Sequence, residues 1–123
     1  MKRLLYVDDD EAMLKKLARH IREHFPGIEP LTCQDPIKAL TLIDNSLDLL
    51  MIDLEMPAVD GKKLLMYAIS RGLDKKKIII VSGRDADYLH QVIPMGGCLC
   101  VLSKNEARQM EVLDMVLASL EKK

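Results

Sequence analysis

Four short runs of almost uninterrupted apolar residues constrain the fold of this chain more than any other part of its sequence. These runs are Leu4–Val7, Leu47–Ile52, Ile78–Val81 and Leu99–Leu102. Apolar runs of this length, without regular alternation of polar residues, are typical of parallel strands that are buried on both faces. A weaker run, Ile28–Cys33, contains Pro30, which cannot donate a hydrogen bond to a neighbouring strand. We therefore predict that this run is the second strand along the chain and that it lies near an edge of the sheet.

The segments that follow the runs have apolar residues at three- and four-residue steps, which predicts amphipathic helices. Pro26-Gly27, Gly72 and Pro94 are expected to end three of them, and Asp35-Pro36 and Asp60-Gly61 to begin two of them. The predicted helices carry their apolar residues at Leu14 to Phe25, Ala39 to Ile43, Leu64 to Ile69, Ala86 to Ile93 and Met110 to Leu120.

Five strand–helix units with short connections predict an α/β fold. The expected architecture is one domain over residues 1–123, with an open, doubly wound parallel sheet of five strands and helices on both faces. In such sheets, ligands bind beyond the carboxyl ends of the strands.

Polar residues follow four of the predicted strands directly. They are Asp8 and Asp9, Asp53, Ser82 and Lys104. Because the carboxyl ends of parallel strands meet at one edge, we expect these side chains to converge. Neighbouring carboxylates repel one another by about 1 to 4 kcal/mol, so a cation or a proton is expected to compensate their charge. Carboxylate oxygens favour Mg²⁺, or Mn²⁺, as that cation.

These residues also carry a resemblance to a known family. The acidic pair after the first strand, the segment Asp53-x-x-Met56-Pro57-x-x-Asp60-Gly61, Ser82 and Lys104 resemble, in order and spacing, those of a response regulator receiver domain of the CheY-like superfamily. The resemblance covers essentially the whole chain. It implies a flavodoxin-like (βα)5 sheet with strand order 2-1-3-4-5, and a phosphoacceptor signalling domain that catalyses only its own phosphorylation and autodephosphorylation.

The same resemblance implies a role for each residue. Asp53 would accept a phosphoryl group from a phosphohistidine, and Lys104 would neutralise the oxygens of the transferring group. The metal would contact Asp9, Asp53 and the backbone carbonyl of Glu55, and Asp8 through a water molecule. Ser82 would report phosphorylation to the surface formed by the fourth helix, fifth strand and fifth helix.

The expected partners are a sensor histidine kinase or a phosphotransfer protein, and that same surface is the default site for a homodimer or an effector. A net charge of -1 gives no reason to expect nucleic-acid binding. No apolar segment is long enough to predict a membrane span, and three cysteines without framework spacing favour a reduced, cytoplasmic protein. Met1 lies immediately before the first strand, so we expect a stand-alone receiver or the first domain of a longer regulator.

Two positions depart from the family pattern. Val101 stands three residues before Lys104, where many relatives carry an aromatic switch residue, and Asn105 replaces the usual proline after Lys104. No cis peptide bond is therefore expected there. The departures leave the phosphorylation chemistry intact and alter the part that would report it.

Glu55, Gly83 and Arg84 are expected to modulate the site, because they lie within two residues of Asp53 or Ser82. Glu55 and Arg84 would form an exposed pair at the mouth of the phosphoryl pocket and control the access of water. The substitution Glu55→Ala should then change the lifetime of the phosphorylated state.

Two other classes of function stay open. A degenerate receiver could act as a constitutive interaction module, and a phosphohydrolase of the haloacid dehalogenase type uses similar residues. The second class normally has another aspartate two residues after its nucleophile, where this chain has Glu55. The acidic residues could also simply cap the first helix, a role that we assign to Asp10.

Overall fold

The computed structural model describes residues 1–84, 86–93 and 96–123, and it contains all ten predicted helices and strands. In chain order the elements are β1 (Lys2–Val7), α1 (Glu11–His24), β2 (Ile28–Cys33), α2 (Pro36–Ala39), β3 (Leu49–Asp53), α3 (Gly61–Ser70), the 3-10 turn η1 (Lys75–Lys77), β4 (Ile78–Ser82), α4 (Ala86–Val92), β5 (Cys100–Ser103) and α5 (Ala107–Lys122).

The five strands form one parallel sheet in the order β2-β1-β3-β4-β5. The predicted fold class and strand order are confirmed, and β2 lies at an edge as its proline indicated. The register places Asp53 beside Val81 and Ser82 beside Ser103. The carboxyl ends of β1, β3, β4 and β5 therefore meet along one edge, which we call the carboxyl rim.

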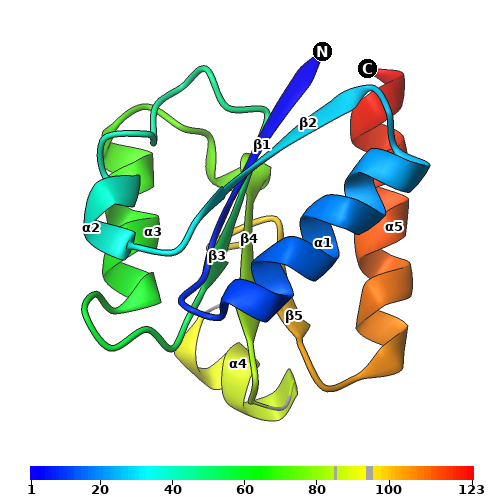
Figure 1. The fold of residues 1–123 in the computed structure, drawn as a ribbon. Helices are drawn as coiled ribbons and strands as arrows, with labels where there is room; N and C mark the ends of the chain where they lie inside the picture. Colours follow the sequence, from blue (N-terminus) through cyan, green and yellow to red (C-terminus); the bar gives the residue numbers. More distant parts are fainter. Residues whose placement is uncertain (85, 94–95) are drawn as a thin grey trace.

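Two helical layers cover the sheet: α1 and α5 lie on one face, and α2, α3 and α4 lie on the other (Figure 1). Successive residues of a strand point to opposite faces of the sheet and so pack into two different apolar clusters. In β1, Tyr6 packs with the residues of α1 and α5, whereas Leu5 and Val7 pack with those of α2, α3 and α4. Burial on both faces explains why the strands read as continuous apolar runs.

The second helix is shorter than its sequence pattern predicted. Asp35 caps it as expected, accepting a hydrogen bond from the backbone N–H of Ile37 at 2.9 Å, but α2 ends at Ala39 rather than near Ile43. Ile43 is nevertheless only 1% exposed, because the turn after α2 folds it into the core. Its apolar character thus reflects burial and not helical periodicity. The predicted end of the fourth helix at Pro94 lies outside the described residues.

Candidate functional site

The carboxyl rim brings together the acidic and basic residues that the sequence singled out. Asp53 ends β3, while Asp8 and Lys104 directly follow β1 and β5. The Lys104 ammonium lies 2.7 Å from Asp8 Oδ2 and 3.4 Å from Asp53 Oδ1. One cation therefore bridges two carboxylates that lie on different strands.

Three carboxylates are close enough to share a metal ion. Asp8, Asp9 and Asp53 each offer an oxygen atom, and these oxygens all lie within 4.8 Å of one another. Asp8 and Asp53 are buried, with 0% and 3% exposure, whereas Asp9 is exposed. A set of hard oxygen donors that opens to solvent on one side suits Mg²⁺, which keeps several water ligands.

Asp8 is held by donors on both of its oxygens. Its Oδ2 accepts hydrogen bonds from the Tyr6 hydroxyl at 2.5 Å and from Lys104, and its Oδ1 accepts one from the backbone N–H of Asp10 at 3.0 Å. Asp10 in turn caps α1, as predicted, by accepting from the N–H of Met13. This arrangement fits an indirect role for Asp8 toward a metal ion, since its oxygens already have partners.

The sequence analysis missed Tyr6. Its hydroxyl lies within the apolar run Leu4–Val7, two residues before Asp8 and therefore on the same face of the strand. A buried tyrosine hydroxyl needs a hydrogen-bond partner, so this position was a usable signal.

The two buried carboxyl groups differ in acidity. Burial and then the charge of Asp8 raise the pKa of Asp53 from 3.8 to about 7, against the opposing effect of Lys104. Burial also disfavours the charged form of Asp8, but hydrogen bonds from Lys104 and Tyr6 outweigh it and hold the pKa of Asp8 below its ordinary value. Lys104 is likewise desolvated, yet the two carboxylates raise its pKa. The carboxyl rim thus stabilises the ion pair of Asp8 and Lys104, whereas the negative charge of an ionised Asp53 is only partly compensated there.

Ser82 is engaged by Glu55. The Ser82 hydroxyl donates to Glu55 Oε1 at 2.5 Å, and the backbone N–H of Gly83 donates to the same oxygen at 3.2 Å. The predicted Glu55–Arg84 pair is wrong: Arg84 instead places its guanidinium 3.9 Å from the centre of the Tyr88 ring, while its backbone N–H donates to Ser82 Oγ. Glu55 thus takes its hydrogen bonds from Ser82 and Gly83, and Arg84 packs on Tyr88.

Hydrogen bonds join the loops after β4 and β5 at Asn105, one of the two positions that depart from the family pattern. Asn105 Nδ2 donates to the carbonyl of Gly83 at 2.8 Å, and the backbone N–H of Lys104 donates to the carbonyl of Ser82 at 2.7 Å. All peptide bonds of the described residues are trans, which agrees with the absence of a proline after Lys104. Val101 is partly buried against the core that includes α4.

Gly61 lets α3 begin directly against the end of β3. A Cβ atom at this position would lie 2.5 Å from the carbonyl oxygen of Asp53 and 2.6 Å from Leu54 Cα. Neither of these backbone atoms can move without displacing the carboxylate of Asp53. The Asp60-Gly61 turn is therefore part of what positions Asp53, with Asp60 capping α3 through the N–H of Lys62.

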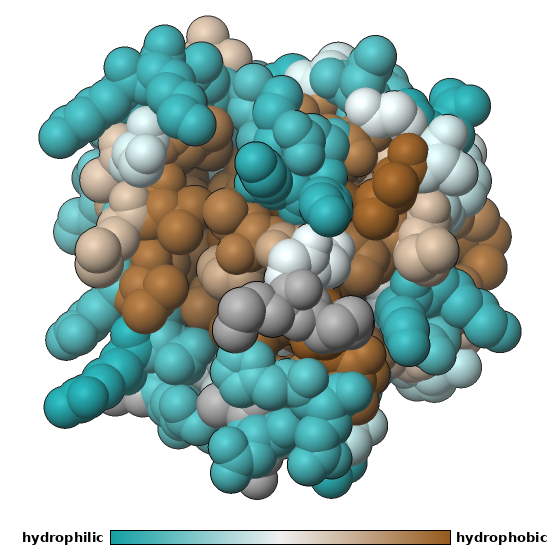
Figure 2. Space-filling view, turned by 180° about the vertical axis from the view of Figure 1, so that it is seen from behind, coloured by the Kyte–Doolittle hydropathy of each residue, from teal (hydrophilic) through white to brown (hydrophobic). Residues whose placement is uncertain are grey.

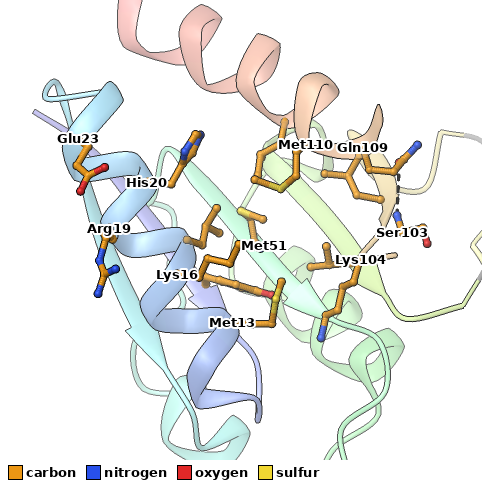
Figure 3. A pocket seen from close by; sticks show the side chains of 15 residues that line it. Met13, Lys16, Arg19, His20, Glu23, Met51, Ser103, Lys104, Gln109 and Met110 are labelled. Carbon is orange, nitrogen blue, oxygen red and sulfur yellow. Dashed lines mark hydrogen bonds between the residues drawn. The ribbon is translucent and has the colours of Figure 1, made fainter. Parts of the chain in front are cut away.

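A cavity of about 230 Å³ lies between α1 and α5, behind the residues that hold Asp8 (Figure 3). Tyr6 and Lys104 both line it, together with Met13 and Met51. Gln109 closes it near the rim by accepting a hydrogen bond from the N–H of Ser103 at 3.4 Å. The positions of Tyr6 and Lys104 thus depend on how α1 and α5 pack.

Comparison with known proteins gives a consistent family. The family model described as response regulator receiver domain matches residues 4–116. The response regulator MprA of Mycobacterium sp. (strain KMS) is 35% identical over 85 residues, which cover 68% of this chain and 36% of that protein. The chain therefore spans about a third of the length of this relative.

Solved structures show the same fold. The receiver domain of the Francisella response regulator 1452 has a TM-score of 0.80 at 26% identity, with 99% of this chain and 98% of that chain covered. The response regulator TrrA of Thermotoga maritima, solved in complex with Mg²⁺ and BeF, has a TM-score of 0.77 at 22% identity, with coverage of 98% and 99%. Within the described part of the chain, no helix is long and apolar enough to cross a membrane.

Proposed function

The chain belongs to the response regulator receiver domains of two-component systems, a family of signalling domains and not of true enzymes, and on that basis we propose that Asp53 is its phosphoacceptor. The donor would be the phosphohistidine of a sensor histidine kinase or of a phosphotransfer protein. The observation that carries the proposal is the Lys104 ammonium between Asp8 and Asp53, beside the exposed carboxylate of Asp9.

In the proposed reaction, an Asp53 carboxylate oxygen attacks the phosphorus atom. The new O–P bond forms as the N–P bond of the phosphohistidine breaks, and the imidazole leaves and takes up a proton. The nucleophile must be ionised, so the positive charge of Lys104 favours the reactive form of Asp53. Lys104 also neutralises charge on the oxygens of the transferring group, which supplies much of the catalysis available to phosphoryl transfer.

A divalent cation, Mg²⁺ or Mn²⁺, would be held by Asp9, Asp53 and the backbone carbonyl of Glu55, and by Asp8 through water. When bound, it would supply further positive charge to the phosphoryl oxygens and to Asp53. Burial and the charge of Asp8 raise the pKa of Asp53 to about 7, and a bound cation would counter this effect and favour the ionised carboxylate.

Ser82 and Glu55 are proposed to connect the chemistry to the surface. Once Asp53 carries a phosphoryl group, the Ser82 hydroxyl would donate to a phosphoryl oxygen and would have to leave Glu55 Oε1. The loop after β4 would then move, and the hydrogen bond from Asn105 to Gly83 would pass that movement to the start of α5. The α4-β5-α5 surface is the proposed site for an effector or a homodimer. Gly83 and Arg84 would modulate the exchange because they bond to Glu55 and Ser82.

We further propose that residues 1–123 act as one receiver unit in the cytoplasm. Intact mass after treatment with acetyl phosphate and Mg²⁺ tests the phosphoacceptor. The parent protein and an Asp74→Asn control should gain about 80 Da, the mass of one phosphoryl group, whereas Asp53→Asn should not. An adduct on Asp53→Asn, or none on the parent, would remove Asp53 from this role.

The mass measurement and two further assays address the alternatives. A degenerate interaction module would show no adduct, and Mg²⁺ with beryllofluoride would leave its spectrum unchanged. A phosphohydrolase would turn over a phosphomonoester many times, whereas the proposed receiver should not.

A further inference from the structure

A hollow of about 430 Å³ lies at the amino ends of the strands, at the opposite end of the sheet from Asp53. We call it the α5 groove, because Met115, Val116, Ser119, Leu120 and Lys123 of α5 form one of its walls. Lys2, Asp48 and Leu49 at the starts of β1 and β3, Lys76 and Lys77 of η1, and Leu99 before β5 complete the lining.

The floor of the α5 groove is apolar and uncovered. Val116 and Leu120 are partly buried against the core, and Met115 and Leu99 line the groove with 72% and 41% of their surface exposed. Figure 2, which views the molecule from behind, shows apolar surface across the middle of that side, with hydrophilic side chains above and below it. Large apolar side chains at this exposure, gathered in a concave region, mark an interaction site more often than isolated ones do.

The rim of the α5 groove is strongly basic. Four lysines line it, Lys2, Lys76, Lys77 and Lys123, against a single carboxylate among the lining residues, Asp48. Asp48 Oδ2 accepts a hydrogen bond from the backbone N–H of Arg3 at 2.8 Å, and the four lysines outnumber this one carboxylate. Within the described residues, none of these four lysines forms an ion pair. Four unpaired ammonium groups around an apolar floor call for a ligand that is both apolar and anionic.

We propose that the α5 groove binds an amphipathic acidic helix of a partner protein. An apolar stripe of that helix would contact Met115 and Leu99, and its flanking carboxylates would face the lysines of η1 on one side and Lys123 on the other. This is the helix-in-groove mode of recognition, with charge complementarity fixing the orientation.

Two other occupants fit the groove less well. A symmetric pairing with a second copy of this chain would set the same patch against itself and bring lysine rims together, at a cost in repulsion. A membrane of anionic lipids would satisfy the lysines, but a planar surface does not fill a concave floor.

The proposal goes beyond the proposed phosphorylation and does not depend on it. Leu49 begins β3 and Asp53 ends it, so about 13 Å of strand separates the groove from the phosphoacceptor. A partner could stay docked here whether or not Asp53 is modified. The variant Asp53→Asn should bind it as the parent does, so the failure of one proposal can be told from the failure of the other.

The test is fluorescence anisotropy with a labelled helical peptide of about 14 residues, built from Leu at i, i+3, i+4 and i+7 spacing and Glu elsewhere. Saturable binding to the intact chain is expected. The double variant Lys76→Glu/Lys77→Glu and the single variant Met115→Glu should each raise the Kd about tenfold or more.

The chain offers matched controls on α3. Lys62 and Lys63 are an exposed adjacent pair outside the groove, and Met66 is 62% exposed. Lys62→Glu/Lys63→Glu makes the same change in net charge, and Met66→Glu the same change in polarity, so both should leave the Kd within about twofold. All of the substituted side chains are exposed, and circular dichroism will show whether each variant is folded.

Four results would overturn the proposal. The first is no saturable binding, and the second is equal weakening by the α3 controls. The third is equal binding of a peptide with the same composition in scrambled order, which would show attraction by charge alone. The fourth is that the peptide does not bind, while the parent binds anionic phospholipid vesicles or forms a concentration-dependent dimer and the groove variants do not. That result would assign the groove to a membrane or to a second copy.

Discussion

Removal of the Glu55 carboxylate should tighten the binding of a phosphoryl analogue. In the unmodified protein, Glu55 Oε1 accepts hydrogen bonds from the Ser82 hydroxyl and from the Gly83 N–H. These donors, the hydroxyl above all, are the groups that a phosphoryl oxygen on Asp53 would need. The carboxylate of Glu55 therefore competes with the phosphoryl group for the same partners and also repels it.

The size of the effect follows from the hydrogen bond that must be given up. A buried hydrogen bond to a charged group contributes about 1.5 to 3 kcal/mol. Glu55 is exposed, so solvent reduces its contribution to about 1 kcal/mol, or about fivefold in affinity. Glu55→Gln keeps an acceptor without the charge, and such neutral bonds are about half as strong, so an intermediate gain of about twofold is expected.

The assay is titration of the protein with beryllofluoride at fixed Mg²⁺, followed by a spectroscopic change near the site. Glu55→Ala should reach half-saturation at about a fifth of the parent's concentration. Glu29→Ala, which removes an exposed carboxylate from β2, is the matched control and should behave as the parent does. Weaker binding by Glu55→Ala, or an equal gain in the control, would refute the competition. Equal dephosphorylation rates for Glu55→Ala and parent would separately refute a role for Glu55 in water access.

Three further predictions concern stability. The folded state holds a proton on Asp53 between pH 3.8 and about 7, so without a metal ion the free energy of unfolding should fall as the pH rises through this range. Asp53→Asn should remove that fall, and urea unfolding in EDTA should show the variant to be about 1 to 2 kcal/mol more stable than the parent at pH 8 but not at pH 4. Equal effects at both pH values would contradict the prediction. Tyr6→Phe should lower the free energy of unfolding by about 1.5 to 3 kcal/mol, because it removes a hydrogen-bond donor to the buried charge of Asp8. The control Tyr67→Phe loses a hydrogen bond to the neutral carbonyl of Leu40 and should lower it by about 1 kcal/mol. Similar decreases for the two variants would argue against a special role of Tyr6. Gly61→Ala should cost about 1 to 3 kcal/mol and weaken beryllofluoride binding, while Gly83→Ala, whose Cβ would meet nothing nearer than 3.9 Å, should leave stability almost unchanged.

The sequence predicted those parts of the structure that depend on burial along the chain. A strand buried on both faces must be apolar at every position, so β1, β3 and β4 were visible as runs, and a polar residue at the end of such a run had to lie on the carboxyl rim. The convergence of Asp8, Asp53 and Lys104 follows from that geometry alone. By contrast, Ile43 is apolar because a turn buries it, and a helical pattern cannot distinguish the two causes.

Contacts made by long side chains could not be predicted in the same way. The sequence placed Glu55 and Arg84 near the pocket, but it could not show that Glu55 would bond to Ser82 while Arg84 packed on Tyr88. Either pairing satisfies charge and spacing, and the choice depends on rotamers that the loop after β4 imposes. Tyr6 is a different case, because its two-residue spacing from Asp8 places both side chains on one face of the strand and could have indicated the hydrogen bond between them.

The same contacts suggest how the site could signal although Val101 and Asn105 depart from the family pattern. A receiver without an aromatic switch residue and without the proline after Lys104 still requires some link from Ser82 to α5. Here the backbone supplies one bond, from the Lys104 N–H to the Ser82 carbonyl, and Asn105 supplies another, to the carbonyl of Gly83. Both bonds end on the residues that Glu55 holds in the unmodified state. Release of Ser82 and Gly83 from Glu55 would therefore move the two loops as one unit. Asn105→Ala removes one of the two links and keeps the backbone bond, so it should reduce the movement of α5 without weakening the binding of beryllofluoride at Asp53.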